Sequence, residues 1–155
     1  YNILLAGYHY GIRHAGMIAN YAYKHAGFFR GEDSSLKVAN TAMILDCLYF
    51  NEEEGNHIDV LTHPGDKGPF DIEDIAKACA DTGTLIEIND KHAHLTVEEI
   101  KIAAKFDVSF IIGSDAHVPE KVGSFEGPLR RALEAGLDPG RIVNISLANE
   151  GQKEI

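Results

Sequence analysis

The feature that most constrains the fold of this chain is an alternation of short apolar runs with longer amphipathic segments. The apolar runs are rich in Ile, Val and Leu and show little polar alternation, which is typical of strands covered on both faces in a parallel sheet. Strands that alternate with helices favour an α/β fold with parallel strands and helical crossovers. The expected strands are residues 2–7, 58–63, 84–89, 108–113 and 142–146, and the expected helices are residues 36–54, 71–83, 96–107 and 127–137.

Local signals indicate where two of these helices begin and end. Asp71 is placed to cap the start of the helix that precedes the third strand, and Gly83 is placed to end it. Thr96 has Glu99 three residues later, which is the pattern of a capping box at the start of the next helix. The sequence therefore predicts these helix boundaries as well as the order of the elements.

The chain is expected to form a single domain over residues 1–155, because no shift in composition marks a second one. Residues 10–35 form the one long irregular segment and are typical of an active-site loop. The two cysteines, Cys47 and Cys79, lie apart in apolar helical surroundings. We expect them to be small buried side chains and not a disulfide.

The charge and composition exclude several classes of function. The formal net charge is −10 and the isoelectric point is about 5.1, so no basic stripe is present to neutralise the phosphates of a nucleic acid. No run reaches the roughly 20 apolar residues that a membrane-spanning helix needs. No basic and then apolar leader opens the sequence. We therefore expect a cytoplasmic protein that binds neither nucleic acid nor membrane.

Polar side chains that can bind metal ions follow each of the first four expected strands. In parallel α/β folds, sites form beyond the carboxyl ends of the strands. Taken singly, each of these residues also has a structural explanation, such as a loop histidine, the start of a turn or a helix cap. Together they converge on one rim of the sheet, which favours a functional site. They are His9, His63, Asp66, Glu87, Asn89, His92, His94, Asp115 and His117.

The stretch "GSDAH" carries the clearest chemistry. On an extended segment, residues two apart point to the same side, so Asp115 and His117 can both face the rim. Imidazole and carboxylate ligands suit zinc, iron or manganese better than calcium. Such a metal acts as a Lewis acid on a phosphoryl oxygen and lowers the pKa of bound water. Metal-assisted hydrolysis is the reaction class that these residues fit best.

For two histidines and one glutamate near these strand ends, a structural role is at least as well supported as metal binding. His92 and His94 form "HAH" in a polar loop, and we expect them to be solvated loop residues. Glu87 lies in an apolar strand and can equally be a buried structural carboxylate or a ligand. Neither a phosphate-binding glycine loop nor a GxSxG nucleophile motif is present.

The ordered motifs "AGYHY", "LTHPGD", "IEIND" and "GSDAH" resemble those of the polymerase-and-histidinol-phosphatase (PHP) family of metal-dependent phosphoesterases. The resemblance spans nearly the whole chain and is closest to the stand-alone phosphatases of that family. It implies part of a distorted (β/α)7 TIM-like barrel that holds a trinuclear site of zinc, manganese or iron, with zinc first. It also implies hydrolysis of a small phosphate monoester, with a metal-bridging hydroxide as the nucleophile.

The same resemblance implies the metal ligands. His9 and His63 would share one metal ion, Asp115 would bind a second and His117 a third, so that Asp115 and His117 are also the expected catalytic residues. The HxH motif that opens the family, and its bridging glutamate, have no match here. The chain is therefore expected to be the C-terminal portion of a PHP domain. The first strand of the chain would then lie at an unpaired edge of the sheet. We therefore expect the chain to associate with a second copy of itself or with a missing N-terminal segment.

Two alternatives to the phosphoesterase remain open at this point. The first is a non-catalytic scaffold or interaction module of the same fold, which the missing HxH motif favours. The second is the PHP domain of a DNA polymerase, which the acidic charge and the absence of any polymerase segment disfavour.

Overall fold

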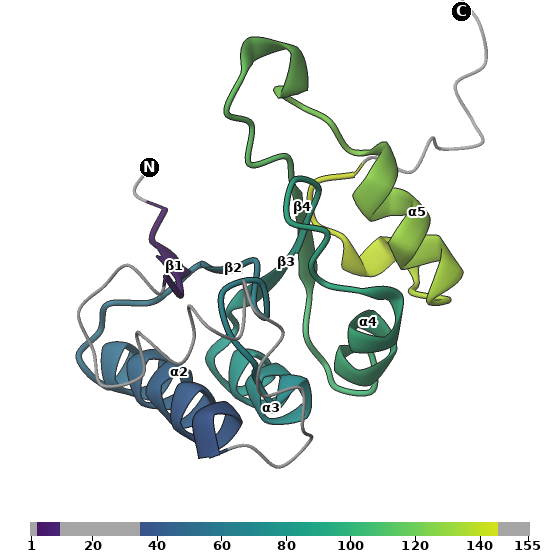
Figure 1. Cartoon of the computed structure of the whole chain (residues 1–155). Coiled ribbons are helices and arrows are strands. Elements are labelled where there is room, and N and C mark those ends of the chain that lie inside the picture. Colours follow the sequence, from purple (N-terminus) through teal and green to yellow (C-terminus); the bar gives the residue numbers. More distant parts are fainter. Residues whose placement is uncertain (1–2, 10–34, 146–155) are drawn as a thin grey trace, which may run out of the picture.

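The structure of the protein is a computed structural model that describes residues 3–9 and 35–145. The segment 10–34, most of the expected active-site loop, lies outside the described residues. The described part is an α/β fold whose four strands pair in parallel in chain order (Figure 1). The strands are β1 (Leu5–Gly7), β2 (Val60–Thr62), β3 (Leu85–Asn89) and β4 (Phe110–Gly113).

The helices of the described part follow the strands and pack against one another in chain order, α2 on α3, α3 on α4 and α4 on α5. This order confirms the expected α/β class with helical crossovers. The helices are α2 (Ser35–Glu53), α3 (Ile72–Thr82), α4 (Val97–Ala103) and α5 (Glu126–Glu134), with short 3-10 helices over Pro119–Lys121 and Pro139–Arg141.

The helix ends confirm the expected caps. The Asp71 carboxylate accepts hydrogen bonds from the backbone N–H groups of Glu73 and Asp74 at the start of α3. Gly83 ends that helix with a φ of 73°, a conformation that glycine adopts without a steric penalty. At the start of α4, Thr96 and Glu99 form the complete capping box.

The core lies between the sheet and the helices. Strand β3 is central to it, because the side chains of Ile86 and Ile88 are fully buried. Ile75 of α3, Ile100 of α4 and Phe110 of β4 are fully buried against the same cluster. Burial on both faces of β3 explains why its sequence shows no regular polar alternation.

The fifth expected strand, residues 142–146, is not formed as a regular strand over the described residues 142–145. Only one isolated parallel bridge joins Ile142 to Phe110. The side-chain amide of Asn144 makes two hydrogen bonds to the backbone of Ile112. Asn144 Oδ1 accepts from the Ile112 N–H at 2.9 Å, and Asn144 Nδ2 donates to the Ile112 carbonyl oxygen at 2.8 Å. A side chain thus occupies hydrogen-bonding groups of β4 that a fifth strand would use. The partial barrel stays a prediction.

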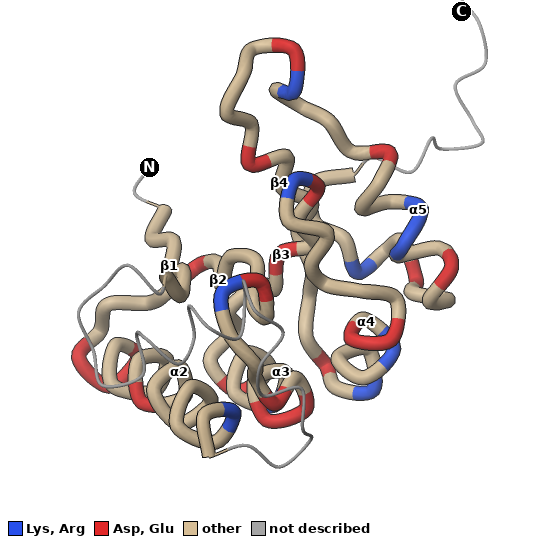
Figure 2. The backbone as a smooth tube through the Cα atoms, in the orientation of Figure 1, with Lys and Arg blue, Asp and Glu red and all other residues tan. Residues whose placement is uncertain are grey.

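Charged residues are spread over the described part of the molecule, and Figure 2 shows acidic residues on each of its four α-helices. This distribution agrees with the acidic composition. No helix among the described residues is both long enough and apolar enough to cross a membrane.

Glu87 of β3 links the carboxyl ends of β2 and β3 and is a buried residue, 8% exposed. Its Oε2 accepts from the backbone N–H of His63 at 2.8 Å and from the Asn89 side-chain amide at 3.0 Å. On the neighbouring strand, a Cβ at Gly113 would overlap with Glu87 Oε1. Glycine is therefore required at the end of β4 to leave room for this carboxylate.

The turn between α4 and β4 is held by Arg141. Its guanidinium donates to the carbonyl oxygens of Ala104, Phe106 and Val108 and lies 5.4 Å from the centre of the Phe110 ring. These bonds satisfy backbone groups that the irregular turn would otherwise leave without partners.

Replacing Arg141 with Met should lower the free energy of unfolding by about 2–4 kcal/mol, because several carbonyl oxygens lose a charged donor. Urea unfolding of the full chain measures this. The control is Arg130→Met, because Arg130 is exposed and makes a 3.8 Å ion pair with Glu134, which contributes about 0.5 kcal/mol or less. Equal losses in the two variants would contradict the structural role of Arg141.

Replacing Gly113 with Ala should lower the free energy of unfolding by about 1–3 kcal/mol, because the new methyl group displaces Glu87 from its pocket. The matched control is Gly140→Ala, whose Cβ would come no closer than 3.3 Å to the Asp138 side chain. Urea unfolding compares the two variants. A Gly113→Ala protein as stable as the wild type would show that Glu87 does not need this space.

Candidate metal centre

The exit of β2 is a tight turn that begins at His63. The backbone N–H of Asp66 donates to the His63 carbonyl at 3.2 Å, and Gly65 has a φ of 103°. Pro64 and Gly65 are the residues that a type II turn favours at its two central positions. The turn leaves His63 and Asp66 buried, at 6% and 2% exposed over the whole residue.

The His63 imidazole has the properties of a metal ligand. Its Nδ1 is buried and has no hydrogen-bond partner among the described residues. Burial is the largest influence on its pKa and lowers it, although the Glu87 carboxylate acts in the opposite direction. The imidazole is therefore favoured in the neutral form, which is the form that binds metal ions.

His92 corrects the expectation that the "HAH" histidines are solvated. Its side chain is 16% exposed and lies between two carboxylates, with Nδ1 3.1 Å from Asp66 Oδ2 and Nε2 2.9 Å from Asp115 Oδ2. Its backbone N–H donates to Asn89 Oδ1 at 2.8 Å, which turns the loop after β3 inward. Burial is the main cause of a lowered pKa at His92, with the Asp66 carboxylate opposing it. The other histidine of the motif, His94, points elsewhere: its Nδ1 lies 3.2 Å from Oε2 of the capping residue Glu99.

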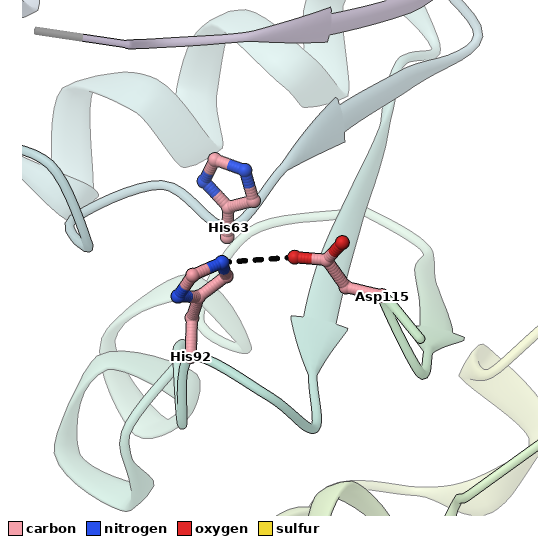
Figure 3. Close-up of side chains that lie close together, drawn as sticks. All are labelled: His63, His92 and Asp115. Atoms are coloured by element: carbon pink, nitrogen blue, oxygen red, sulfur yellow. Dashed lines mark ion pairs between the residues drawn. The ribbon is translucent and has the colours of Figure 1, made fainter. Parts of the chain in front are cut away.

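Asp115 reaches the same place from the exit of β4. Its backbone φ is 45°, and its side chain is 28% exposed. His63, His92 and Asp115 each offer one ligand atom, and these atoms lie within 4.8 Å of one another. Figure 3 shows His92 and Asp115 pointing toward each other, with the His63 ring beside this pair. Two of the expected ligands, His63 and Asp115, are thus brought together.

The other two expected ligands, His9 and His117, lie outside the cluster of His63, His92 and Asp115. His9 is exposed, but its ring centre lies 5.1 Å from that of His63, so it borders the cluster. The His117 side chain is 64% exposed. Its ring nitrogens lie 2.7 and 2.8 Å from Lys91 Nζ, and its Nδ1 lies 2.8 Å from the Asp115 carbonyl oxygen. Binding of metal by His9, His63, Asp115 and His117 stays a prediction.

The residues present fit a divalent first-row metal ion. Two imidazoles and a carboxylate are a ligand set that such ions accept. The buried Nδ1 of His63, which lacks a hydrogen-bond partner among the described residues, is the atom that a bound ion would satisfy. Glu87 is not part of this set, and its Oε2 accepts two hydrogen bonds from the protein. Of the two alternatives for Glu87, its contacts favour the structural carboxylate.

Sequence reasoning missed the inward position of His92 and the contact between His92 and Asp66. The motif "IEINDKHAH" places both histidines of the loop at a strand exit. What separates His92 from His94 is the bond from the His92 backbone to Asn89, a contact that residue spacing does not reveal.

Known proteins resemble this chain. A family model described as PHP-associated matches residues 98–125. A probable phosphatase of Syntrophotalea carbinolica is 33% identical over 135 residues, 79% of this chain and 53% of the relative. A probable phosphatase of Shewanella halifaxensis is 31% identical over 121 residues, 72% of this chain and 47% of the relative.

A third relative, a probable phosphatase of Proteus mirabilis, is 34% identical over 114 residues, 63% of this chain and 46% of the relative. The chain thus spans about half the length of the curated relatives it matches. The model and the relatives confirm the resemblance that the strand-exit motifs carry: over the part that it spans, this chain belongs to the PHP family.

Proposed function

We propose that this protein takes part in the metal-dependent hydrolysis of small phosphate monoesters, with its site at the strand exits around His63 and Asp115. The observation that carries the proposal is the convergence of His63, His92 and Asp115, together with the buried Nδ1 of His63 that has no hydrogen-bond partner among the described residues. The relatives named probable phosphatases support the reaction class.

A divalent cation at this cluster would supply Lewis-acid chemistry on a phosphoryl oxygen. We propose zinc as the ion, with manganese and iron as alternatives, because all three accept imidazole and carboxylate ligands. The protein's part is to hold the ligands in place. The Glu87 carboxylate fixes the backbone at His63, and Asn89 fixes the backbone at His92.

The surroundings of Asp115 suit an anionic substrate. A cavity of about 360 Å³ opens beside Asp115, and its lining residues include Lys91 and Lys121 and also the acidic Asp90. The ammonium groups would offset the negative charge that a phosphate group brings to a protein with a net charge of −10. We propose that the phosphate monoester enters through this cavity.

The test is hydrolysis of p-nitrophenyl phosphate by the full chain loaded in turn with zinc, manganese or iron. We expect hydrolysis that a chelator removes and that added metal restores. Asp115→Asn should lower kcat/KM by on the order of 100-fold or more, because even residues that only support metal ligands cost about 10–100-fold when they are replaced.

Asp107→Asn is the matched control, because Asp107 is exposed and lies in the loop after α4. It should keep the wild-type rate. A folded chain that binds metal but hydrolyses no phosphate ester with any of the three ions would contradict the catalytic proposal and favour a non-catalytic scaffold.

We also propose that the chain associates through β1. Within the described residues β1 pairs only with β2, and Ile3, Leu4 and Leu5 beside or within it are 68%, 45% and 60% exposed. An apolar edge strand invites pairing with a second copy of the chain. Light scattering should show a dimer or larger species that Leu5→Lys shifts toward the monomer. A monomeric wild type at moderate concentration would contradict this proposal.

A further inference from the structure

The candidate metal centre contains a residue that the PHP resemblance does not supply. The motifs imply His9, His63, Asp115 and His117, whereas the cluster in the structure is His63, His92 and Asp115. The two sets differ in a way that can be measured, because His117 and His92 come from different loops and have different surroundings.

His92 is already placed against a second ligand. Two ligand atoms that each lie about 2.0–2.1 Å from one zinc ion are about 3.3 Å apart at a tetrahedral angle. His92 Nε2 and Asp115 Oδ2 are 2.9 Å apart, which is close to that spacing. The ring centres of His92 and His63 are 5.0 Å apart, so the third ligand lies beside the pair.

The other nitrogen of His92 faces a buried carboxylate. Nδ1 lies 3.1 Å from Asp66 Oδ2, and the Asp66 side chain is 1% exposed. A histidine that binds a metal through one nitrogen commonly donates the N–H of the other to a carboxylate, which fixes the orientation of the ring. Asp66 is held in turn by Lys67, whose Nζ is 2.5 Å from the same oxygen.

One buried hydrogen-bond network fixes the backbones that carry both histidines. The His63 N–H and the Asn89 side-chain amide donate to the same oxygen of Glu87. The other end of the Asn89 side chain accepts from the His92 N–H. The guanidinium of Arg131 on α5 donates to the backbone carbonyl oxygens of Asn89 and Leu95, the residues on either side of the loop. Contacts within the protein therefore fix the backbone at both ends of the loop.

His117 lacks these supports. Its side chain is 64% exposed, and its ring nitrogens face the ammonium group of Lys91, a cation that opposes the approach of a metal ion. His94, the other histidine of "HAH", is engaged by Glu99 in the cap of α4.

We propose that His63, His92 and Asp115 form a three-ligand site for one divalent first-row metal ion, and that Asp66 is the positioning residue that orients His92. The inference deepens the proposed function and rests on it for the presence of a metal. It concerns binding and not hydrolysis, so a chain that binds metal through these residues without hydrolysing a phosphate ester would uphold it while the catalytic proposal fails.

The experiment is a zinc titration of the full chain in competition with a chromophoric chelator, repeated with cobalt to read the ligand field from its visible absorption. His92→Gln should weaken zinc binding by on the order of 100-fold, and Asp66→Asn by about 10–100-fold. The control is the His94→Gln variant, which should bind zinc within about threefold of the wild type because His94 is engaged by Glu99. The His117→Gln variant is titrated beside it, and its loss of affinity should be smaller than that of His92→Gln.

Two outcomes overturn the inference. The first is a wild-type chain that binds zinc no more tightly than the His92→Gln variant. The second is a loss of affinity in His117→Gln that matches or exceeds the loss in His92→Gln, because it would assign the site to the ligands that the resemblance implies. Circular dichroism checks the folding of each variant. If His92→Gln does not fold, Asp66→Asn, which keeps the shape of the side chain, decides the question.

Discussion

The rim of this sheet depends on one buried carboxylate, that of Glu87. A carboxylate removed from water is costly unless hydrogen bonds compensate it. Here the compensation comes from the backbone N–H of His63 on one side and the side-chain amide of Asn89 on the other. The bare backbone of Gly113 provides the space. The exits of β2 and β3 are thus tied to one charge, and a shift of either one would leave that charge with fewer partners.

Much of the architecture could be predicted because it follows from local rules. The cap at Asp71 and the capping box at Thr96 depend on side chains within a few residues of each other, so the sequence reveals them directly. The convergence of His63 and Asp115 follows from parallel strands, whose carboxyl ends share one edge. These predictions needed only the order of the elements.

The predictions that failed depend on contacts between distant residues. Asn144 folds its side chain onto Ile112, 32 positions away, where a fifth strand was expected. His92 and His94 are two residues apart in one polar loop, yet one turns inward to the carboxylates and the other supports a helix cap. Periodicity places a loop at the correct end of a strand. Periodicity does not reveal which side chains of that loop point toward the site, because contacts with distant residues determine this.

Backbone strain supplies an independent argument that this rim is the functional part of the described chain. Among the described residues, the non-glycine positions with positive φ are His63, Ala93 and Asp115, with φ values of 30°, 55° and 45°. All three lie in the loops beyond β2, β3 and β4. The left-handed conformation costs roughly 1–2 kcal/mol per residue relative to the right-handed one, and such strain persists where the surrounding structure imposes it.

Glycine would remove this cost, and the chain does use glycine with positive φ elsewhere, at Gly83 and Gly136 at the ends of helices. At His63 and Asp115 it would also remove the imidazole and the carboxylate. The strained backbone at two strand exits keeps the imidazole of His63 and the carboxylate of Asp115 at the rim, which supports the site that we propose there. The metal ion that we propose at this rim would account both for the strain and for the buried Nδ1 of His63.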